Sequence, residues 1–299
     1  MIPIRFQSYT TNHTYQQILV HVDEQLGAAY LYMQPKPRPC FTPTILEDIR
    51  TFQETIARYV RSEVDQDGQS SIRYFVSASS VPGIYNLGGD LALFANLIAE
   101  KNRGGLLDYA ITSTRLAYNN SVSFGVPVTT IALIQGTAQG GGFEAALSHD
   151  VIVAERGTRM GFPEVLFNLF PGMGAYNFLS KRIAPAMAER LILSGKLYEA
   201  EELYELGLID VLANPGEGHD KLRSYIRESD RRVHSRKLIR YARAKYNHVT
   251  YEEMLDIAEL WVESALSLKD NEIRTMKRLV HAQDRQIRQA ANEHKKERA

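Results

Sequence analysis

The amino-acid sequence predicts an α/β protein with a mainly parallel sheet, followed by a helical C-terminal part. Apolar segments typical of buried strands alternate with segments of helical periodicity, and glycine-rich turns stand where strand would meet helix. Beyond about residue 215 the pattern is mostly helical. We therefore expect an α/β core over residues 1–215 and a helical region over residues 216–299.

The first elements are a predicted β-hairpin and a helix. The segments 15–25 and 27–34 are rich in Val, Ile, Leu and Tyr and are separated by a turn-like Gln25-Leu26-Gly27. A helix is expected to begin after Thr42, because Thr is a good N-cap and Pro43 suits the first helical position. Its apolar residues recur at helical spacing and predict one buried face: Ile45, Ile49, Phe52, Ile56 and Val60.

Three further buried strands are expected over residues 72–80, 126–136 and 150–156. The first leads through a loop into a long helical stretch from Asp90, which we expect to be interrupted at Gly104-Gly105. Later segments predict a short strand and three amphipathic helices, over residues 209–213, 230–245, 251–268 and 270–292. Helices of this kind pack either on their own core or on a neighbouring subunit.

Composition excludes several classes of protein. The 35 basic and 35 acidic residues balance, which argues against nucleic-acid binding. The N-terminus lacks the pattern of a signal peptide, and no stretch has the length of a membrane span. The single cysteine, Cys40, cannot form an intrachain disulfide. A reducing, cytoplasmic setting is the expectation.

Two glycine turns are the first candidates for chemistry. One is NLGGDLALF, with Gly88 and Gly89; the other is IQGTAQGGGFEAAL, with Gly140 and Gly141. Glycine permits tight strand-to-helix turns, and it also lets backbone N–H groups approach an anion or a developing oxyanion. Both interpretations stay open on the residues alone. Asp90 is most simply a helix N-cap.

Two carboxylates accompany these turns. Glu144 follows the glycine run and stabilises a helix start, or it serves as a general acid/base above an oxyanion site. Glu164, in GFPEV, is a second helix-start acid, but its neighbours are apolar. An apolar setting raises a carboxyl pKa and suits proton transfer near neutral pH.

Other chemistries lack a motif. No HExxH, CxxC, Walker or Gly-x-Ser-x-Gly pattern occurs, and the spacing of His13, His149 and His281 is not that of metal ligands. We therefore expect no metal and no cofactor. Cys40 is interpreted as a buried or loop thiol rather than a nucleophile.

The order NLGGD, IQGTAQGGGFE, GFPEV, LFPGMGA resembles the enoyl-CoA hydratase/isomerase (crotonase) superfamily over about residues 15–215. The resemblance implies a crotonase-like (ββα)n spiral core. Within the superfamily, QGGGFEAALS, PEVLFNLFPGMGAY and RTMKRLVHAQ look closest to the diffusible signal factor synthases, bacterial enzymes that make cis-2-unsaturated fatty acid signals.

The resemblance implies roles for individual residues. The N–H groups of Gly89 and Gly141 fall on the oxyanion hole, and Glu144 and Glu164 on the two catalytic glutamates of hydratases. Positions implied for substrate binding, including an apolar pocket for the acyl tail, are Leu87, Gly88, Gly140, Met173, Gly174, Trp261 and Leu279. For Trp261 and Leu279, core packing is an equal alternative.

The resemblance also implies a reaction. A 3-hydroxyacyl chain on acyl carrier protein would be dehydrated, with Glu164 removing the α-proton and Glu144 protonating the leaving hydroxyl, and the thioester would then be hydrolysed to the free acid. Many CoA-using members carry a basic residue where this chain has Ala92. Ala92 therefore favours a carrier-protein substrate. The alternatives are an enoyl-CoA hydratase and a non-catalytic crotonase-fold binding protein.

The remaining expectations concern partners. Residues 221–250 hold ten Lys or Arg and two Asp or Glu, which indicates either a solvated helix face or a dock for acidic acyl carrier protein. The candidate docking residues are Arg231, Arg232, Arg236, Lys237 and Arg240. By resemblance, the chain forms a trimer or a dimer of trimers, and a sensor kinase is a further candidate partner. The helical C-terminal region would complete the acyl pocket and the oligomer contacts.

Overall fold

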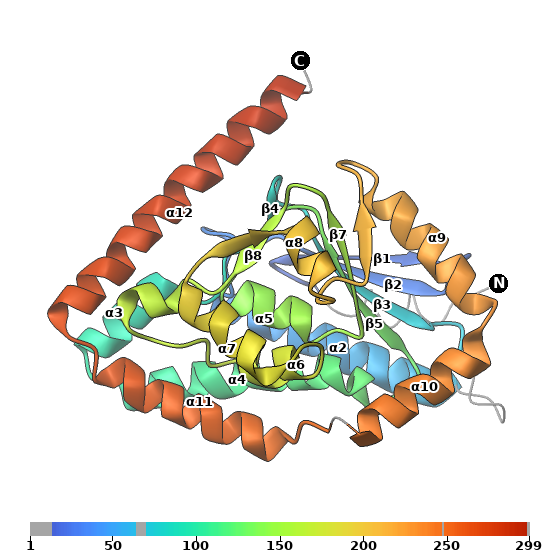
Figure 1. Cartoon of the computed structure of the whole chain (residues 1–299), viewed down its shortest axis with the longest axis horizontal. Coiled ribbons are helices and arrows are strands. Elements are labelled where there is room, and N and C mark those ends of the chain that lie inside the picture. Colours follow the sequence, from blue (N-terminus) through green and yellow to red (C-terminus); the bar gives the residue numbers. More distant parts are fainter. Residues whose placement is uncertain (1–13, 64–69, 247, 298–299) are drawn as a thin grey trace.

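The computed structural model describes residues 14–63, 70–246 and 248–297, a few side chains in the last helices excepted. Its larger sheet has six strands in the order β1-β2-β3-β5-β7-β10 (Figure 1). β1 and β2 form the predicted antiparallel hairpin, and all the other neighbours pair in parallel. The strands are β1 (Ile18–Asp23), β2 (Ala28–Met33), β3 (Tyr74–Ser79), β5 (Thr129–Ile134), β7 (Val151–Glu155) and β10 (Val211–Ala213). The α/β prediction is confirmed.

A second sheet of short strands, in the order β4-β6-β8-β9, was missed by the sequence analysis. Its members are β4 (Ile84–Asn86), β6 (Thr137–Gln139), β8 (Arg159–Gly161) and β9 (Leu197–Glu199). Each has only three residues, too few for an alternation of apolar and polar side chains to show. β4 and β6 pair in parallel. Both glycine turns therefore leave from adjacent strands of this small sheet.

Helices cover both faces of the larger sheet. Side chains alternate along β3, so that Phe75 packs into the core with α2 and α5 while Val76 packs on the opposite face with α9. The helices before residue 215 are α2 (Pro43–Glu63), α3 (Leu91–Ala99), α4 (Arg103–Ser121), α5 (Gly141–Leu147), α6 (Ala175–Ser180), α7 (Pro185–Ser194) and α8 (Ala200–Glu205). Short 3₁₀ turns lie at η1 (Ser123–Gly125) and η2 (Glu164–Phe167).

The predicted helix starts are capped. Thr42 Oγ1 accepts a hydrogen bond from Ile45 N at 3.3 Å, and Asp90 Oδ1 accepts one from Leu93 N at 3.1 Å. The break after α3 lies at residues 100–102 and not at Gly104-Gly105. Asn102 is the reason, because its side chain accepts from Gly105 N at 2.9 Å and so starts α4 just before the glycines.

The chain after residue 215 forms four helices in its described part, α9 (Gly218–Asp230), α10 (Val233–Tyr246), α11 (Tyr251–Leu266) and α12 (Asp270–Glu297). α9 packs on the larger sheet, α11 runs beside α4, and α12 passes α3 and η2 before it stands away from the sheets (Figure 1). The boundary at residue 215 stays a prediction. No helix in the described ranges combines the length and the apolarity that crossing a membrane requires.

Replacing Leu222 by Ala tests whether α9 is part of the core. Leu222 is fully buried against the larger sheet, so Leu222→Ala should lower the free energy of unfolding by about 2–5 kcal/mol in urea denaturation. Leu238→Ala, in the next helix, is the control, because Leu238 is 53% exposed and should cost less than about 0.5 kcal/mol. Equal effects of the two changes contradict a shared core.

Candidate active site

The two glycine turns touch each other. A Cβ atom on Gly88 would stand 2.8 Å from the carbonyl oxygen of Gln139 and 3.1 Å from the backbone nitrogen of Gly141, so neither turn tolerates a side chain there. Asn86 Oδ1 fixes the first turn by accepting from Gly88 N at 2.8 Å. In the described part of the chain, no hydrogen bond is recorded for the N–H of Gly89 or of Gly141. Both amides are therefore available to one oxygen atom between the turns.

Glu144 lies in the first turn of α5 and is 2% exposed. Its Oε1 accepts hydrogen bonds from Met173 N at 2.7 Å and from Ala175 N at 2.9 Å. Burial raises the pKa of this carboxyl to about 7, and the two backbone N–H groups partly offset the effect because they favour the charged form. Glu144 is thus a fixed carboxyl that titrates near neutral pH.

Glu164 is the first residue of η2. Its Oε2 is buried and has no hydrogen-bond partner among the described residues. Burial raises the pKa of the Glu164 carboxyl to about 8, and the negative charge of Glu144 adds to the shift. Gly140, at a φ of 50°, leaves room for this group, since a Cβ there would collide with the Glu164 carboxylate.

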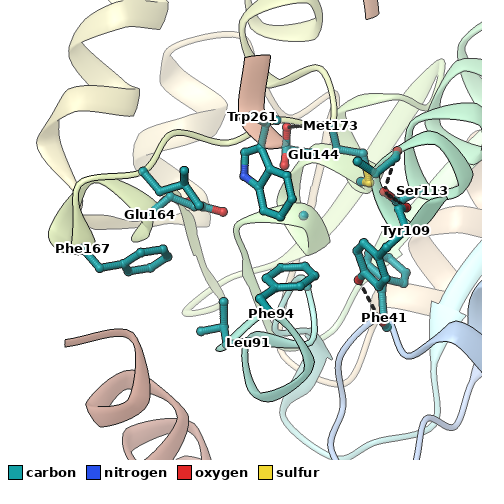
Figure 2. A pocket seen from close by; sticks show the side chains of 15 residues that line it. Phe41, Leu91, Phe94, Tyr109, Ser113, Glu144, Glu164, Phe167, Met173 and Trp261 are labelled. Carbon is teal, nitrogen blue, oxygen red and sulfur yellow. Dashed lines mark hydrogen bonds between the residues drawn. The ribbon is translucent and has the colours of Figure 1, made fainter. Parts of the chain in front are cut away.

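One cavity collects these groups (Figure 2). Aromatic rings form much of its wall: the Phe94 ring lies edge-on to Trp261, with centroids 5.0 Å apart, and to Tyr109 at 4.8 Å. The wall is formed by Phe41, Gly89, Leu91, Phe94, Tyr109, Ala110, Ser113, Gly141, Glu144, Glu164, Phe167, Leu169, Gly172, Met173 and Trp261. Trp261 belongs to α11, so the C-terminal region takes part in the site.

Six of the predicted residues line this cavity: Gly89, Gly141, Glu144, Glu164, Met173 and Trp261. Five do not. Gly88 and Gly140 shape the turns behind it, and Leu87 is buried with its carbonyl accepting from Gln283 Nε2 at 3.2 Å. Gly174 caps α6, and Leu279 packs beside the cluster that holds Phe94. For Leu279 the packing alternative fits better than a pocket wall.

Sequence reasoning missed most of the apolar wall. Helical spacing can predict that Phe94 and Ala110 are buried, but it does not say that they face a cavity. Tyr109 is held by a hydrogen bond that it donates to the carbonyl oxygen of Phe41 at 2.6 Å, a contact across 68 positions that no local pattern reveals. The interpretation of Cys40 fits, since the thiol is 3% exposed and burial raises its pKa to about 12.

The side chains of the basic segment, residues 221–250, differ in exposure and in contacts. Arg231 and Arg232 are exposed, whereas Arg236 lies over the Tyr225 ring at 4.9 Å from its centroid. The side chains of Lys237 and Arg240 lie outside the described residues. In Figure 1, α10 lies at the opposite end of the molecule from α3, which borders the cavity.

The arrangement defines a class of chemistry. Two unpaired amides can stabilise the charge on a thioester oxygen, and two carboxyls with raised pKa values can exchange protons with adjacent carbon and oxygen atoms. A family model described as enoyl-CoA hydratase/isomerase matches residues 63–283. The chain belongs to this family, and the predicted membership is confirmed.

Individual relatives agree with this assignment. The rat mitochondrial methylglutaconyl-CoA hydratase is 34% identical over 148 residues, which are 49% of this chain and 45% of the relative. The crotonyl-CoA hydratase of Syntrophomonas wolfei is 24% identical over 68% of this chain and 71% of its own length. The chain spans about half the length of the first curated relatives it matches.

Among solved structures, the human mitochondrial delta3-delta2-enoyl-CoA isomerase superposes with a TM-score of 0.71 at 18% identity, over 91% of this chain and 99% of that one. At this identity the likeness shows the fold alone. The crotonase-like architecture expected from the sequence is confirmed.

Because of the two glutamates, the free energy of unfolding should fall as the pH rises. Their pKa values in the folded state lie above the ordinary 4.5, so the folded protein binds more protons than the unfolded chain between about pH 4.5 and 8. Glu164→Gln removes one such group. The variant should exceed the original protein in free energy of unfolding at about pH 9, by on the order of 3 kcal/mol, and match it near pH 4.

The measurement is urea unfolding at several pH values. Glu47→Gln serves as the control, because the exposed Glu47 carboxylate is hydrogen-bonded to Arg50 and its pKa is lowered. This variant should gain nothing at high pH. The same pH dependence for the Glu164 variant and the original protein would mean that burial does not hold the proton on Glu164.

Proposed function

We propose that the chain adds water to, or removes it from, the C2–C3 bond of an acyl thioester. The observation that carries the proposal is the meeting of two buried carboxyls and two free amides at one cavity. The thioester oxygen would accept hydrogen bonds from Gly89 and Gly141, which stabilise the enolate. Loss of one such donor typically costs about 100- to 1000-fold in rate.

The two glutamates divide the proton transfers. Because Glu144 accepts two backbone hydrogen bonds and Glu164 Oε2 accepts none, the resting pair carries its proton on Glu164 near neutral pH. In hydration, the Glu144 carboxylate takes a proton from the attacking water while Glu164 protonates C2. Dehydration runs through the other protonation state, with Glu164 as base, which lies about 1 kcal/mol higher for pKa values one unit apart.

Activity of two variants tests the pair. Glu144→Gln and Glu164→Gln keep the side-chain volume but cannot exchange the proton, so each should lower kcat/KM for crotonyl-pantetheine by roughly 10²–10⁴-fold. Glu47→Gln, an exposed residue that does not line the cavity, should keep the original rate. Retention of full activity in either cavity variant contradicts the two-carboxyl mechanism.

The finer proposal concerns substrate and product. We infer that the substrate is a 3-hydroxyacyl chain on acyl carrier protein and that hydrolysis follows dehydration, giving a cis-2-unsaturated fatty acid. The support is the resemblance of QGGGFEAALS and PEVLFNLFPGMGAY to signal synthases, together with Ala92. The same amides can stabilise the tetrahedral intermediate of hydrolysis. A homo-oligomer and a sensor-kinase partner belong to this proposal by resemblance alone.

A CoA hydratase is the second candidate, since the relatives described above are named for CoA thioesters. Mass spectrometry of products from matched 3-hydroxyacyl-CoA and 3-hydroxyacyl carrier protein separates the two. A free acid from the carrier-protein substrate supports the synthase. A 2-enoyl thioester that accumulates intact supports the hydratase. Unchanged substrate in both reactions supports the non-catalytic binding protein instead.

Charge reversal tests the basic segment as a carrier-protein dock. If acyl carrier protein binds there, Arg231→Glu with Arg232→Glu should raise KM for the carrier-protein substrate several-fold and flatten its salt dependence, because the rim charges steer an acidic partner. KM for the pantetheine thioester, which lacks the protein, should stay the same and is the internal control. An unchanged KM for the carrier-protein substrate places the dock elsewhere.

A further inference from the structure

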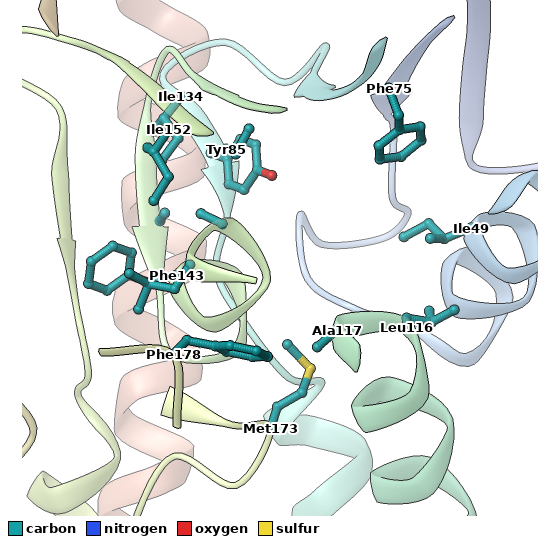
Figure 3. Close-up of a cluster of buried hydrophobic side chains, with 14 of the residues drawn as sticks. Ile49, Phe75, Tyr85, Leu116, Ala117, Ile134, Phe143, Ile152, Met173 and Phe178 are labelled. Atoms are coloured by element: carbon teal, nitrogen blue, oxygen red, sulfur yellow. The ribbon is translucent and has the colours of Figure 1, made fainter. Parts of the chain in front are cut away.

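A second cavity lies directly behind the first, inside the core between α2, α4 and the larger sheet. Figure 3 shows part of its wall, with Phe75, Ile49 and Leu116 on one side and Tyr85 and Met173 on the other. The complete wall is formed by Leu31, Met33, Phe41, Leu46, Ile49, Phe75, Ser77, Tyr85, Ser113, Leu116, Ala117, Asn120, Ala145, His149 and Met173.

The wall of this second cavity is mostly apolar, and all of its residues except Ala145 are buried. Protein interiors are packed as densely as organic crystals, so an unfilled space in a core forfeits contacts among its lining atoms. Cavities lined by aliphatic and aromatic side chains exclude water and take apolar guests. The chemistry of the wall thus fits a hydrocarbon.

The polar groups at one end of the second cavity satisfy one another. His149 Nδ1 lies 2.7 Å from the carbonyl oxygen of Ala145, which can only accept, so Nδ1 carries the proton. His149 Nε2 then accepts from Ser77 Oγ at 2.9 Å, and Ser77 Oγ accepts from the Tyr85 hydroxyl at 2.8 Å. The ring is neutral, because burial lowers the pKa of His149 to about 4. None of these hydrogen-bonded groups carries a charge, so none of them requires a charged ligand.

The two cavities adjoin, and Met173 is one of the residues between them. Three residues, Phe41, Ser113 and Met173, belong to both walls. The backbone of Met173 is held by the hydrogen bond to Glu144 Oε1, whereas its side chain has three rotatable bonds and adapts to a neighbour at small cost. Glu144 faces the first cavity and the next residue, Ala145, faces the second. An acyl chain that extends from the reacting carbons can therefore pass Met173 into the second cavity.

We propose that the second cavity is the subsite for the distal part of the acyl chain, and that it selects thioesters long enough to pass Met173. The inference rests on the proposed thioester chemistry and names the class of substrate, a medium-length to long unbranched acyl chain. Short chains such as crotonyl end in the first cavity. Each further methylene buried in the second is worth about fourfold in kcat/KM, the value for one buried CH₂.

Two alanines on α4 provide a matched pair of variants. Ala110 lines only the first cavity and Ala117 only the second, two helical turns further along. The substrates are 2-enoyl thioesters of pantetheine, the part common to CoA and acyl carrier protein, from crotonyl to tetradecenoyl. Ala117→Leu should leave kcat/KM for crotonyl within twofold and lower it for the long chains by about tenfold or more. Ala110→Leu should lower kcat/KM for every chain length.

A second variant tests the subsite independently of whether Ala117→Leu folds. Ile49→Ala enlarges the second cavity and should move the optimum to longer chains. Either of two results overturns the proposal: Ala117→Leu keeping the original chain-length profile, or Ala117→Leu lowering crotonyl and tetradecenoyl rates equally. An optimum that Ile49→Ala does not move overturns it as well.

Binding separates failure of the subsite from failure of the proposed function. Trp261 is the only tryptophan of the chain and lines the first cavity, so its fluorescence reports ligands without turnover. Unreactive S-alkyl pantetheines should bind more tightly as the alkyl group lengthens, and Ala117→Leu should remove that gain. If no thioester is turned over but affinity still rises with alkyl length, the proposed hydration reaction is wrong and the proposed subsite is retained. Affinity that does not depend on alkyl length overturns the subsite.

Discussion

The contact between the two glycine turns is the constraint on which the site depends. β4 and β6 are only three residues long, yet their parallel pairing sets Gly88 against Gly141 at a distance that excludes any side chain. Two amides that leave separate strands thereby reach the same point in space. A preorganised pair of donors costs no rearrangement when charge develops on a bound oxygen. The pairing of β4 with β6 in the small sheet brings these turns together.

The two carboxyls are stabilised unequally. Burial disfavours the charge on both, and the negative charge of Glu144 raises the pKa of Glu164 further. Hydrogen bonds from Met173 and Ala175 favour the charged form of Glu144 only. In the proposed mechanism the pair shares about one proton near neutral pH, so that one carboxyl would act as the acid and the other as the base. An acid/base couple of this kind lowers stability in the pH range where it is useful.

The sequence predicted what local chemistry determines. The hairpin, the N-caps at Thr42 and Asp90, and the glutamates with their glycine turns follow from residue type and spacing. It did not predict the second sheet, because three-residue strands carry no periodicity. It also could not place Tyr109 against Phe41, because that contact depends on how α4 meets the loop before α2. For Leu279 the sequence left core packing and a pocket wall open, since burial on a helix does not say which cavity is near.

The helical C-terminal region forms part of the wall of the first cavity. Trp261 reaches the first cavity from α11, and its ring lies against Phe94 of α3. This contact favours packing of α11 on the chain's own core. The reacting groups then lie between two apolar regions, the aromatic wall around Trp261 and the deep cavity behind Met173. Glu144 and Ala145 line different cavities, so the proposed proton transfer and the proposed acyl subsite involve neighbouring residues of α5.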